Sequence, residues 1–339
     1  MARGLSLFIA LAVTACDRGA DSQGSSDAGE RVDARTNDVA ANGCVVGAQL
    51  GEAARCTADN QRCSKVLRIV SYNVHALPEL VSGENPKDRL RRIGEILAEQ
   101  RRAGRLPDFV LLQEAFDKED RLIDRAGFAE VIAGPESSTS LSSGLFALTD
   151  HPVVGRDSEA YEACAAEDCL SEKGVLAIAT HPEGMPEPAI VITTHLQAQS
   201  ENDATRIDQI NELVPYLDKQ GVSSGASIFA GDFNFKARPD HDAHPSYRHF
   251  LESTPYLPAG KECLDDPLHC SVDLGPDGNT DEADLWLSTN DHQFYFAADA
   301  SPYDIAIVSA ALTFTEDFEG EPLSDHWAKQ FDYCFSWTP

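Results

Sequence analysis

The fold of this sequence is decided by the run Ser227-Ile228-Phe229-Ala230-Gly231-Asp232-Phe233-Asn234, which is apolar until it ends in a carboxylate and an amide. Asp232 and Asn234 are two residues apart, so their side chains lie on one face of a predicted strand. Polar groups at the end of a strand in a rigid sheet are common components of active sites. This run therefore predicts both a buried strand and one part of a functional site.

The same pattern recurs at four other places. Each place alone has an ordinary explanation, such as a turn-capping asparagine, a core histidine or a solvated loop. Five such apolar runs with polar ends are hard to obtain by chance in this order along one chain, so we expect them to form one site. The four are Val70-Ser71-Tyr72-Asn73, Leu111-Leu112-Gln113-Glu114, Ile192-Thr193-Thr194-His195 and Leu323-Ser324-Asp325-His326.

Strands and helices alternate along one domain. Continuous or alternating apolar runs predict strands, whereas apolar residues that recur every three to four positions predict helices. This mixture predicts an α/β fold in which two packed sheets are flanked by helices. The helices are expected at Pro86–Gly104 and Asn202–Gln220, and the strands at Val66–Asn73, Asp108–Glu114, Gly144–Leu148, Gly174–Thr180, Ala189–His195, Ser227–Asn234 and Asp304–Val308.

Composition and charge narrow the possible functions. The 339 residues include 27 Lys+Arg and 56 Asp+Glu, which gives a net charge of −29. This acidity argues against a protein held on nucleic acid by its net charge, although a local metal-lined cleft leaves a nuclease open. Because 42% of the residues are hydrophobic and 8% are aromatic, the chain can form a core, which excludes a fully disordered protein.

The first 43 residues precede the predicted domain. Residues 1–16 have a basic start, a short apolar run and the ending Val13-Thr14-Ala15-Cys16, which resembles a bacterial lipoprotein signal. We therefore expect an exported protein held on a membrane by a lipid on Cys16; a plain secretory signal is the alternative. Residues 17–43 are predicted to be a disordered acidic tether, 44–65 a cysteine-containing lead-in and 66–339 the functional domain.

The nine cysteines support export. Without Cys16 eight remain, and an even number of cysteines in an exported protein indicates disulfides. A zinc site is the alternative, but no two cysteines are spaced as Cys-x-x-Cys. We expect the pairs Cys164–Cys169 and Cys263–Cys270, with Cys334 joined to the cluster of Cys44, Cys56 and Cys63.

The chemistry of the five polar sites suits phosphoester hydrolysis. Carboxylate and amide oxygens are the hard ligands that Mg²⁺ prefers, and a metal there stabilises charge on a phosphoryl group. Two histidines supply a general base and a donor to a phosphate oxygen. The residues of these types are Asn73, Glu114, Asp232 and Asn234 for the metal, and His195 and His326 for proton transfer.

In their order along the chain, these residues resemble the motifs of the endonuclease/exonuclease/phosphatase superfamily. The resemblance covers about Val66 to Ala328. It implies a four-layer α/β sandwich and Mg²⁺-dependent phosphoester hydrolysis by residues 66–339, with other divalent cations open. The motifs are Ser71-Tyr72-Asn73, Gln113-Glu114, Thr194-His195, Gly231-Asp232-Phe233-Asn234, Asp304 and Ser324-Asp325-His326.

The resemblance implies a metal-binding role for five residues. Asn73 and Glu114 would hold the catalytic metal. Asp232 and Asn234 would bind metal or phosphate and help to position the attacking water. Asp325 would complete the metal or histidine network.

The resemblance also implies three catalytic roles around the histidines. His195 would donate to a phosphate oxygen, His326 would be the general base, and Asp304 would orient His326. Ile305 departs from the family pattern, in which an aromatic residue or histidine usually follows the aspartate. Asp291-His292 repeats the Asp-His dipeptide, but we expect Asp325-His326 to be the functional pair because Asp291-His292 precedes an aromatic run.

A narrower resemblance is to the sphingomyelinase C branch of this superfamily, which hydrolyses sphingomyelin to ceramide and phosphocholine. It implies a phospholipid substrate, and an acidic protein suits a choline headgroup better than a polyanion. The chain departs from the haemolytic members, because Ala310 to Leu323 is too short for their membrane-inserting hairpin. The resemblance rests on Gln113–Asp117, Leu170–Leu176 and Thr194–Gln199.

Other functions remain open. A nuclease of the same superfamily would need a Lys/Arg-lined groove beside the site, and the basic residues instead concentrate at 89–105. A catalytically idle surface-binding lipoprotein would lack site residues, and a phosphatase acting on inositol phosphates is a weaker option. We expect a monomer. His75 is expected to be structural, and the polar stretches 240–244 and 273–282 are expected to be solvated loops.

Overall fold

The computed structural model describes residues 44, 54–57, 62–137, 141–237, 243–265, 270–273, 286–287 and 289–339. All of these belong to the compact unit Arg35–Pro339. The predicted leader 1–16, the lipidation site Cys16 and the tether 17–43 lie outside the described residues and stay predictions. The same holds for most of the two polar loops, 240–242 and 274–282.

The first sheet contains the strand that carries Asn73. That strand, β2, runs parallel to β3 and antiparallel to β16, so the sheet is mixed. Consecutive residues of β2 are buried on both faces, which explains its continuous apolar sequence. The order is β11 (Ser271–Asp273), β13 (Asp304–Thr313), β16 (Ala328–Trp337), β2 (Arg62–Ala76), β3 (Phe109–Ala115), β5 (Phe146–Thr149) and β4 (Glu130–Ala133), with β1 (Arg55–Thr57) beside β2.

The second sheet carries His195 and Asp232 on two parallel neighbours, β8 and β9, and its other pairings are antiparallel. Its order is β10 (Leu257–Pro258), β12 (Asp291–Ala297), β9 (Ala226–Asp232), β8 (Ala189–His195), β7 (Gly174–Thr180) and β6 (Val153–Ala160). A separate short hairpin joins β14 (Asp317–Phe318) to β15 (Glu321–Pro322).

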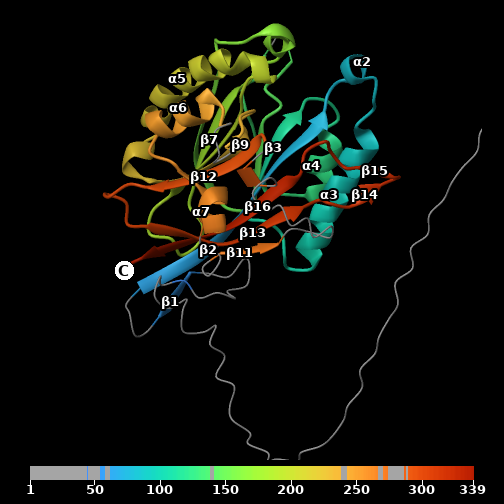
Figure 1. Ribbon diagram of the computed structural model, residues 1–339. Coiled ribbons are helices and arrows are strands. Elements are labelled where there is room, and N and C mark those ends of the chain that lie inside the picture. The colour runs from blue at the N-terminus through green and yellow to red at the C-terminus, as the bar shows by residue number, and fades with distance from the viewer. Residues whose placement is uncertain are drawn as a thin grey trace, which may run out of the picture. The chain divides into compact units, whose positions relative to one another are not determined.

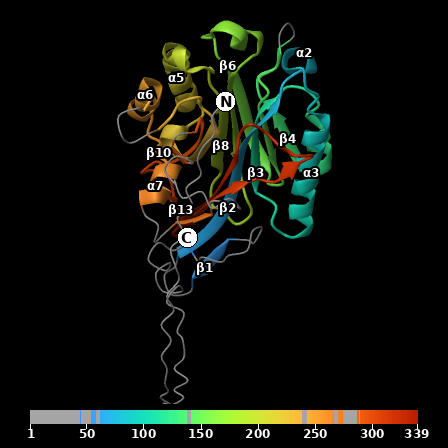
Figure 2. The ribbon, with the colours of Figure 1, turned by 45° about the vertical axis from the view of Figure 1, so that its right-hand side comes forward.

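Helices cover the outer faces of both sheets (Figures 1 and 2). They include α3 (Lys87–Arg102) and α4 (Asp120–Ala126) on the first sheet, and α5 (Asp203–Lys219) and α6 (Pro245–Ser253) on the second. The other helical segments are α2 (Glu79–Ser82), α7 (Ala259–Asp265) and the 3₁₀ turns η2 (Ala166–Leu170), η3 (Ser200–Asn202) and η4 (Val222–Ser224).

Two hydrophobic clusters hold these layers together. One lies between the sheets and includes Ile69, Leu111 and Phe229. The other lies between the first sheet and α3, and includes Val70 and Leu90. The predicted α/β sandwich of two mixed sheets flanked by helices is confirmed. Among the described residues, none of the helices has the length and apolar character needed to cross a membrane.

The four disulfides agree with the sequence prediction. The local pairs Cys164–Cys169 and Cys263–Cys270 are present. Cys334 is bonded to Cys44, and Cys56 to Cys63. The C-terminal strand is thereby tied to the segment that precedes β1.

Candidate active site

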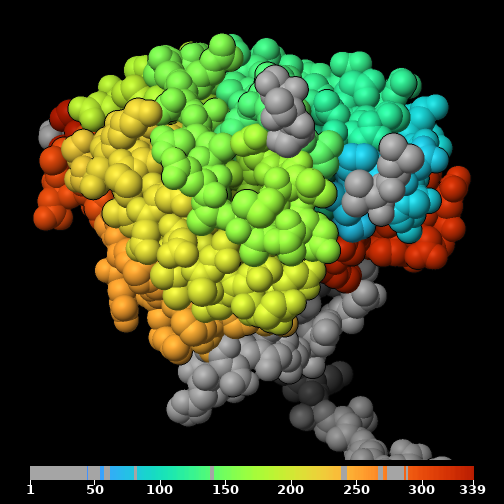
Figure 3. All heavy atoms as spheres, turned by 90° about the horizontal axis from the view of Figure 1, so that it is seen from above, coloured from blue at the N-terminus to red at the C-terminus, as the bar shows by residue number. Residues whose placement is uncertain are grey.

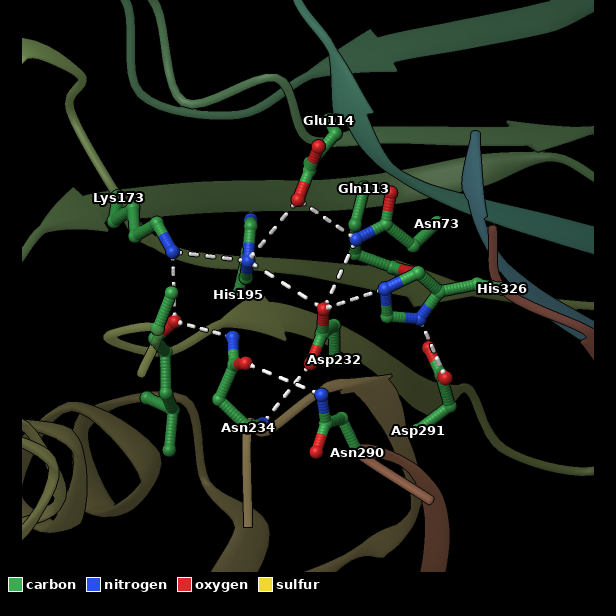
Figure 4. Close-up of polar contacts among 12 residues, drawn as sticks. Asn73, Gln113, Glu114, Lys173, His195, Asp232, Asn234, Asn290, Asp291 and His326 are labelled. Carbon is green, nitrogen blue, oxygen red and sulfur yellow. Dashed lines mark hydrogen bonds and ion pairs between the residues drawn. The ribbon is translucent and has the colours of Figure 1, made fainter. Parts of the chain in front are cut away.

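The predicted polar residues other than Asp304 meet at one end of the sandwich, and Figure 4 shows most of them. Strands β2 and β3 are parallel, as are β8 and β9, so their carboxyl ends bring Asn73, Glu114, His195 and Asp232 together. Strands β16 and β12 run antiparallel to β2 and β9, so they begin at this end. His326 lies just before β16, and Asp291 is the first residue of β12.

Asn73 lies between two carboxylates. Its Nδ2 donates to Glu114 Oε1 at 3.0 Å and to Asp232 Oδ2 at 2.9 Å. Its Oδ1 accepts a 3.0 Å hydrogen bond from the backbone nitrogen of His75. The amide nitrogen therefore faces the carboxylates, and Asn73 holds the two acidic groups together.

Glu114 is held in its charged form. Burial alone would raise the pKa of this carboxyl, but hydrogen bonds from His75 and Asn73 bring the pKa well below its usual value. Glu114, Asn234 and His75 also have positive φ values of 53°, 53° and 46°. Such backbone conformations are uncommon for residues other than glycine and cluster at functional sites.

His195 is buried beside both carboxylates. Its Nε2 lies 3.5 Å from Asp232 Oδ2 and 3.8 Å from Glu114 Oε1. Burial and, to a smaller extent, the charge of Lys173 lower the pKa of His195. Within the described part of the chain, its Nδ1 is buried without a hydrogen-bond partner. The neutral ring is therefore favoured.

Lys173 is the residue that approaches His195 from the other side. Its Nζ lies 3.0 Å from His195 Nε2 and donates to the carbonyl of Leu196 at 2.9 Å. It also pairs with Asp168 at 2.8 Å. Lys173 lies within the motif Leu170–Leu176, but its contact with His195 was not predicted.

Asp291, not Asp304, contacts His326. The His326 Nδ1 to Asp291 Oδ2 distance is 2.8 Å, and His326 Nε2 lies 3.8 Å from Asp232 Oδ2. Burial would lower the pKa of His326, but the charge and hydrogen bond of Asp291, together with Asp232 and Asp325, raise it to about 10.

The expectation that Asp304 orients His326 was wrong. Asp304 begins β13, its side chain is 76% exposed, and it pairs with Arg62. Asp325 and His326 of the preferred dipeptide both line the pocket, and Asp291 of the other dipeptide contacts His326. His292 is buried and bonds the carbonyl of Phe235, and burial lowers its pKa to about 3.

Asn234 and Asp325 lie at the edge of the cluster. The Asn234 backbone nitrogen donates to Asp232 Oδ1, and its Nδ2 donates to the carbonyl of Leu196, both at 3.0 Å. Asp325 is more than half exposed and lies 3.4 Å from His75 Nδ1, which also lies 3.5 Å from Glu114 Oε2. His75 was expected to be structural, yet it bridges two acidic groups of the site.

The cluster forms the floor of a pocket of about 580 Å³. A pocket of this size accommodates a small molecule or a lipid headgroup. The basic side chains that line it are Lys173, Lys236 and four histidines, His75, His195, His244 and His326. Several arginines of α3 have partners elsewhere, among them Arg91 with Glu95 and Arg101 with Asp150.

The donor groups fit a divalent cation. Glu114, His195 and Asp232 each offer a ligand atom within 4.8 Å of the others, as do Asp232, Asp291 and His326. Two carboxylates share the amide of Asn73, which concentrates negative charge, and carboxylate oxygens suit Mg²⁺. For Asn73 to act as a ligand through its oxygen, its amide would have to turn over.

The chain belongs to the Endonuclease/Exonuclease/phosphatase family, which matches residues 70–326. It is a hydrolase of that family. A sphingomyelinase of Dictyostelium discoideum is 27% identical over 176 residues, which cover 40% of this chain and 38% of the relative. The chain thus spans about two fifths of the length of that relative.

Solved structures share the fold. Sphingomyelinase C of Streptomyces griseocarneus has a TM-score of 0.58 at 17% identity, covering 79% of this chain and 99% of its own. A double mutant of beta toxin from Staphylococcus aureus, solved with bound magnesium ions, has 0.57 at 15% identity, with 81% and 100% covered. D. rerio TDP2 complexed with single-strand DNA product has 0.58 at 20% identity, with 79% and 99% covered.

Proposed function

We propose that the protein is a Mg²⁺-dependent phosphodiesterase that hydrolyses a choline phospholipid, with sphingomyelin as the first substrate to test. The observation that carries this proposal is the meeting of Glu114 and Asp232 at Asn73, with His195 and His326 beside them. The sphingomyelinase relative and the magnesium-bound neighbour support the choice of substrate and metal.

The metal would be held mainly by Glu114 and Asp232, with Asn73, Asn234 and Asp325 close enough to assist. When bound, Mg²⁺ would stabilise negative charge on the phosphoryl group. Asn234 would also help to position the attacking water.

Proton transfer and phosphate binding belong to the remaining polar residues. His195 and Lys173 would donate to phosphate oxygens. His326, oriented by Asp291, would take a proton from the attacking water once cation binding at the neighbouring carboxylates has lowered its raised pKa.

A nuclease is the second candidate, because TDP2 with its DNA product shares the fold. The lining of the pocket favours the phospholipid, since a polynucleotide needs a cationic track along its backbone. Here two lysines face a pocket that also carries Glu167, Asp168 and Asp325.

We also propose that the protein is exported and that Cys16 carries a lipid anchor. The four disulfides are in keeping with an oxidising compartment. Labelling of cells with a radioactive fatty acid, in wild type and Cys16→Ser, tests the anchor; equal labelling would contradict it.

The test of the activity compares phosphocholine release from sphingomyelin vesicles with nicking of plasmid DNA, each with Mg²⁺ and with EDTA. Glu114→Gln and His326→Gln should each lower lipid hydrolysis by about 10²–10⁴-fold, the range for removal of a catalytic group. Glu316→Gln, on the surface beside Arg92, is the matched control and should behave as wild type. DNA nicking without phosphocholine release would contradict the lipid proposal.

A further inference from the structure

The pocket has an apolar wall that the polar cluster does not use. Four backbone segments far apart in sequence build it. The backbone nitrogen of Asp117 donates to the carbonyl of Ala76 at 3.0 Å, and that of Leu141 donates to the carbonyl of Leu170 at 3.0 Å. These bonds align the apolar wall, whose members are Leu77, Pro78, Phe116, Leu141 and Leu170.

Leu170 is the outermost member of this wall. Among the described residues it is the most exposed large hydrophobic side chain, at 64%. Leu170 is the last residue of η2 and directly follows Cys169, which closes a loop with Cys164. Asp168 of the same loop accepts a 2.7 Å hydrogen bond from the Ala198 nitrogen and pairs with Lys173. The loop is therefore fixed with Leu170 in solvent, although burying such a side chain gains about 1.5–3 kcal/mol.

We infer that the apolar wall binds the hydrocarbon chains of a phospholipid while the lipid is still in a bilayer, so that Leu170 is the residue that enters the lipid surface. This inference rests on the proposed function and extends it to the hydrocarbon chains, which leave with the alcohol product. The wall is continuous with the polar floor formed by Glu114 and Asp232, so one molecule can fill both.

Charge favours a zwitterionic lipid surface as the partner. The rim around Leu170 carries Glu167 and Asp168, and the chain has a net charge of −29. A polynucleotide or an anionic membrane would be repelled by this rim, whereas a choline lipid surface has no net charge. Figure 3 looks onto this end of the molecule, where the green segment around η2 lies close to the blue segment around α2.

The test separates the contribution of the hydrocarbon chains to hydrolysis from that of the headgroup. Leu170→Ser is compared with wild type on sphingomyelin vesicles and on p-nitrophenyl phosphorylcholine, a soluble diester without chains. We expect kcat/KM on vesicles to fall by about tenfold, the effect of losing one good apolar contact, and hydrolysis of the soluble diester to stay within about twofold. Val154→Ser is the control, because Val154 is 59% exposed on β6 and does not line the pocket.

Each outcome decides between the two proposals. Equal activity of Leu170→Ser and wild type on vesicles would overturn the inference and leave the proposed function standing. An equal loss on both substrates would also overturn it, because the loop would then only support the catalytic residues. If wild type cleaves neither substrate, the proposed function fails. The inference is then judged by flotation of the wild type and Leu170→Ser with sphingomyelin/phosphatidylcholine vesicles in EDTA; equal flotation would overturn it.

Discussion

Asp291 Oδ2 lies 2.8 Å from His326 Nδ1, although 35 residues separate the two in the chain. The contact follows from strand pairing, since β12 runs antiparallel to β9 and sets Asp291 opposite Asp232. Asp291 therefore contacts His326, whereas Asp232 on the neighbouring strand lies beside Glu114 and Asn73, where a metal would bind. The carboxylate accepts a hydrogen bond from Nδ1 and leaves Nε2 facing the pocket.

Replacement of Asp291 is expected to affect catalysis far more than replacement of Asp304. Asp291→Asn removes the charge that orients His326, so kcat should fall by about 10²-fold or more. Asp304→Asn loses only a surface ion pair with Arg62, worth about 0–1 kcal/mol, and should keep wild-type activity. Steady-state phosphodiester hydrolysis by Asp291→Asn and Asp304→Asn checks this prediction. If Asp304→Asn lost activity and Asp291→Asn kept it, the assignment of Asp304 as the residue that orients His326 would be restored.

The pKa of His326 provides a second prediction. In EDTA it should titrate near 10 because Asp291, Asp232 and Asp325 favour the charged ring. Asp291→Asn should lower this pKa, and the signal of the ring C–H in NMR spectra follows the titration. Cation binding at these carboxylates should also lower it, because the negative charge around the ring is then partly neutralised. A pKa that is the same in wild type and Asp291→Asn would contradict this account.

The same shift makes stability depend on pH. Because the pKa in the folded protein exceeds that of an unfolded histidine, the ion pair stabilises the fold fully below about pH 6.5 and loses this effect as pH rises towards 10. The difference in unfolding free energy between wild type and His326→Gln should therefore be larger at about pH 6 than at about pH 10. Urea unfolding in EDTA measures it, and a pH-independent difference would show that the charged pair does not stabilise the fold.

Some parts of this fold could be predicted from the sequence because their signals are local. Strands β7 and β8 were predicted with the bounds they have, since each is a continuous apolar run ending at a polar residue. The helices α3 and α5 followed from their periodic apolar faces. The local disulfides followed from close spacing.

Other parts depend on pairing that no local pattern specifies. The strands β12 and β16, which begin at the site, were missed. Asp291 and Asp304 both start a strand, and only the register of β12 against β9 shows which one reaches His326. Lys173 contacts His195 across the β7–β8 pair, which likewise required the structure.

Lys329 is expected to hold the loop that leads into Asp291. It is buried on β16, and its Nζ donates to the carbonyls of Trp286 at 3.3 Å and Asp291 at 2.8 Å and to the hydroxyl of Thr289. Burial lowers its pKa to about 8. Lys329→Met would remove a buried donor from these acceptors, which costs about 1–3 kcal/mol, and should reduce kcat with little change in KM.

The matched control for Lys329→Met is Lys219→Met, because Lys219 is an exposed lysine at the end of α5 that pairs with Asp157. Thermal unfolding and steady-state kinetics of the two variants provide the measurement. Similar stability of the two variants would show that the buried ammonium does not hold the loop.

Gly231 is expected to be required for the approach of β8 to β9. A Cβ at this position would lie 2.2 Å from the carbonyl oxygen of Thr194, a backbone atom that cannot move without displacing His195. Gly231→Ala should therefore destabilise the protein by about 1–3 kcal/mol, as overpacking does, and should lower activity because Asp232 and His195 are its immediate neighbours. Gly155→Ala on β6 of the same sheet is the control, since its Cβ would meet Ala179 at an ordinary 3.4 Å. Urea unfolding and phosphodiester hydrolysis distinguish the variants, and a Gly231→Ala protein as stable and active as Gly155→Ala would mean that the two strands can separate without cost to the site.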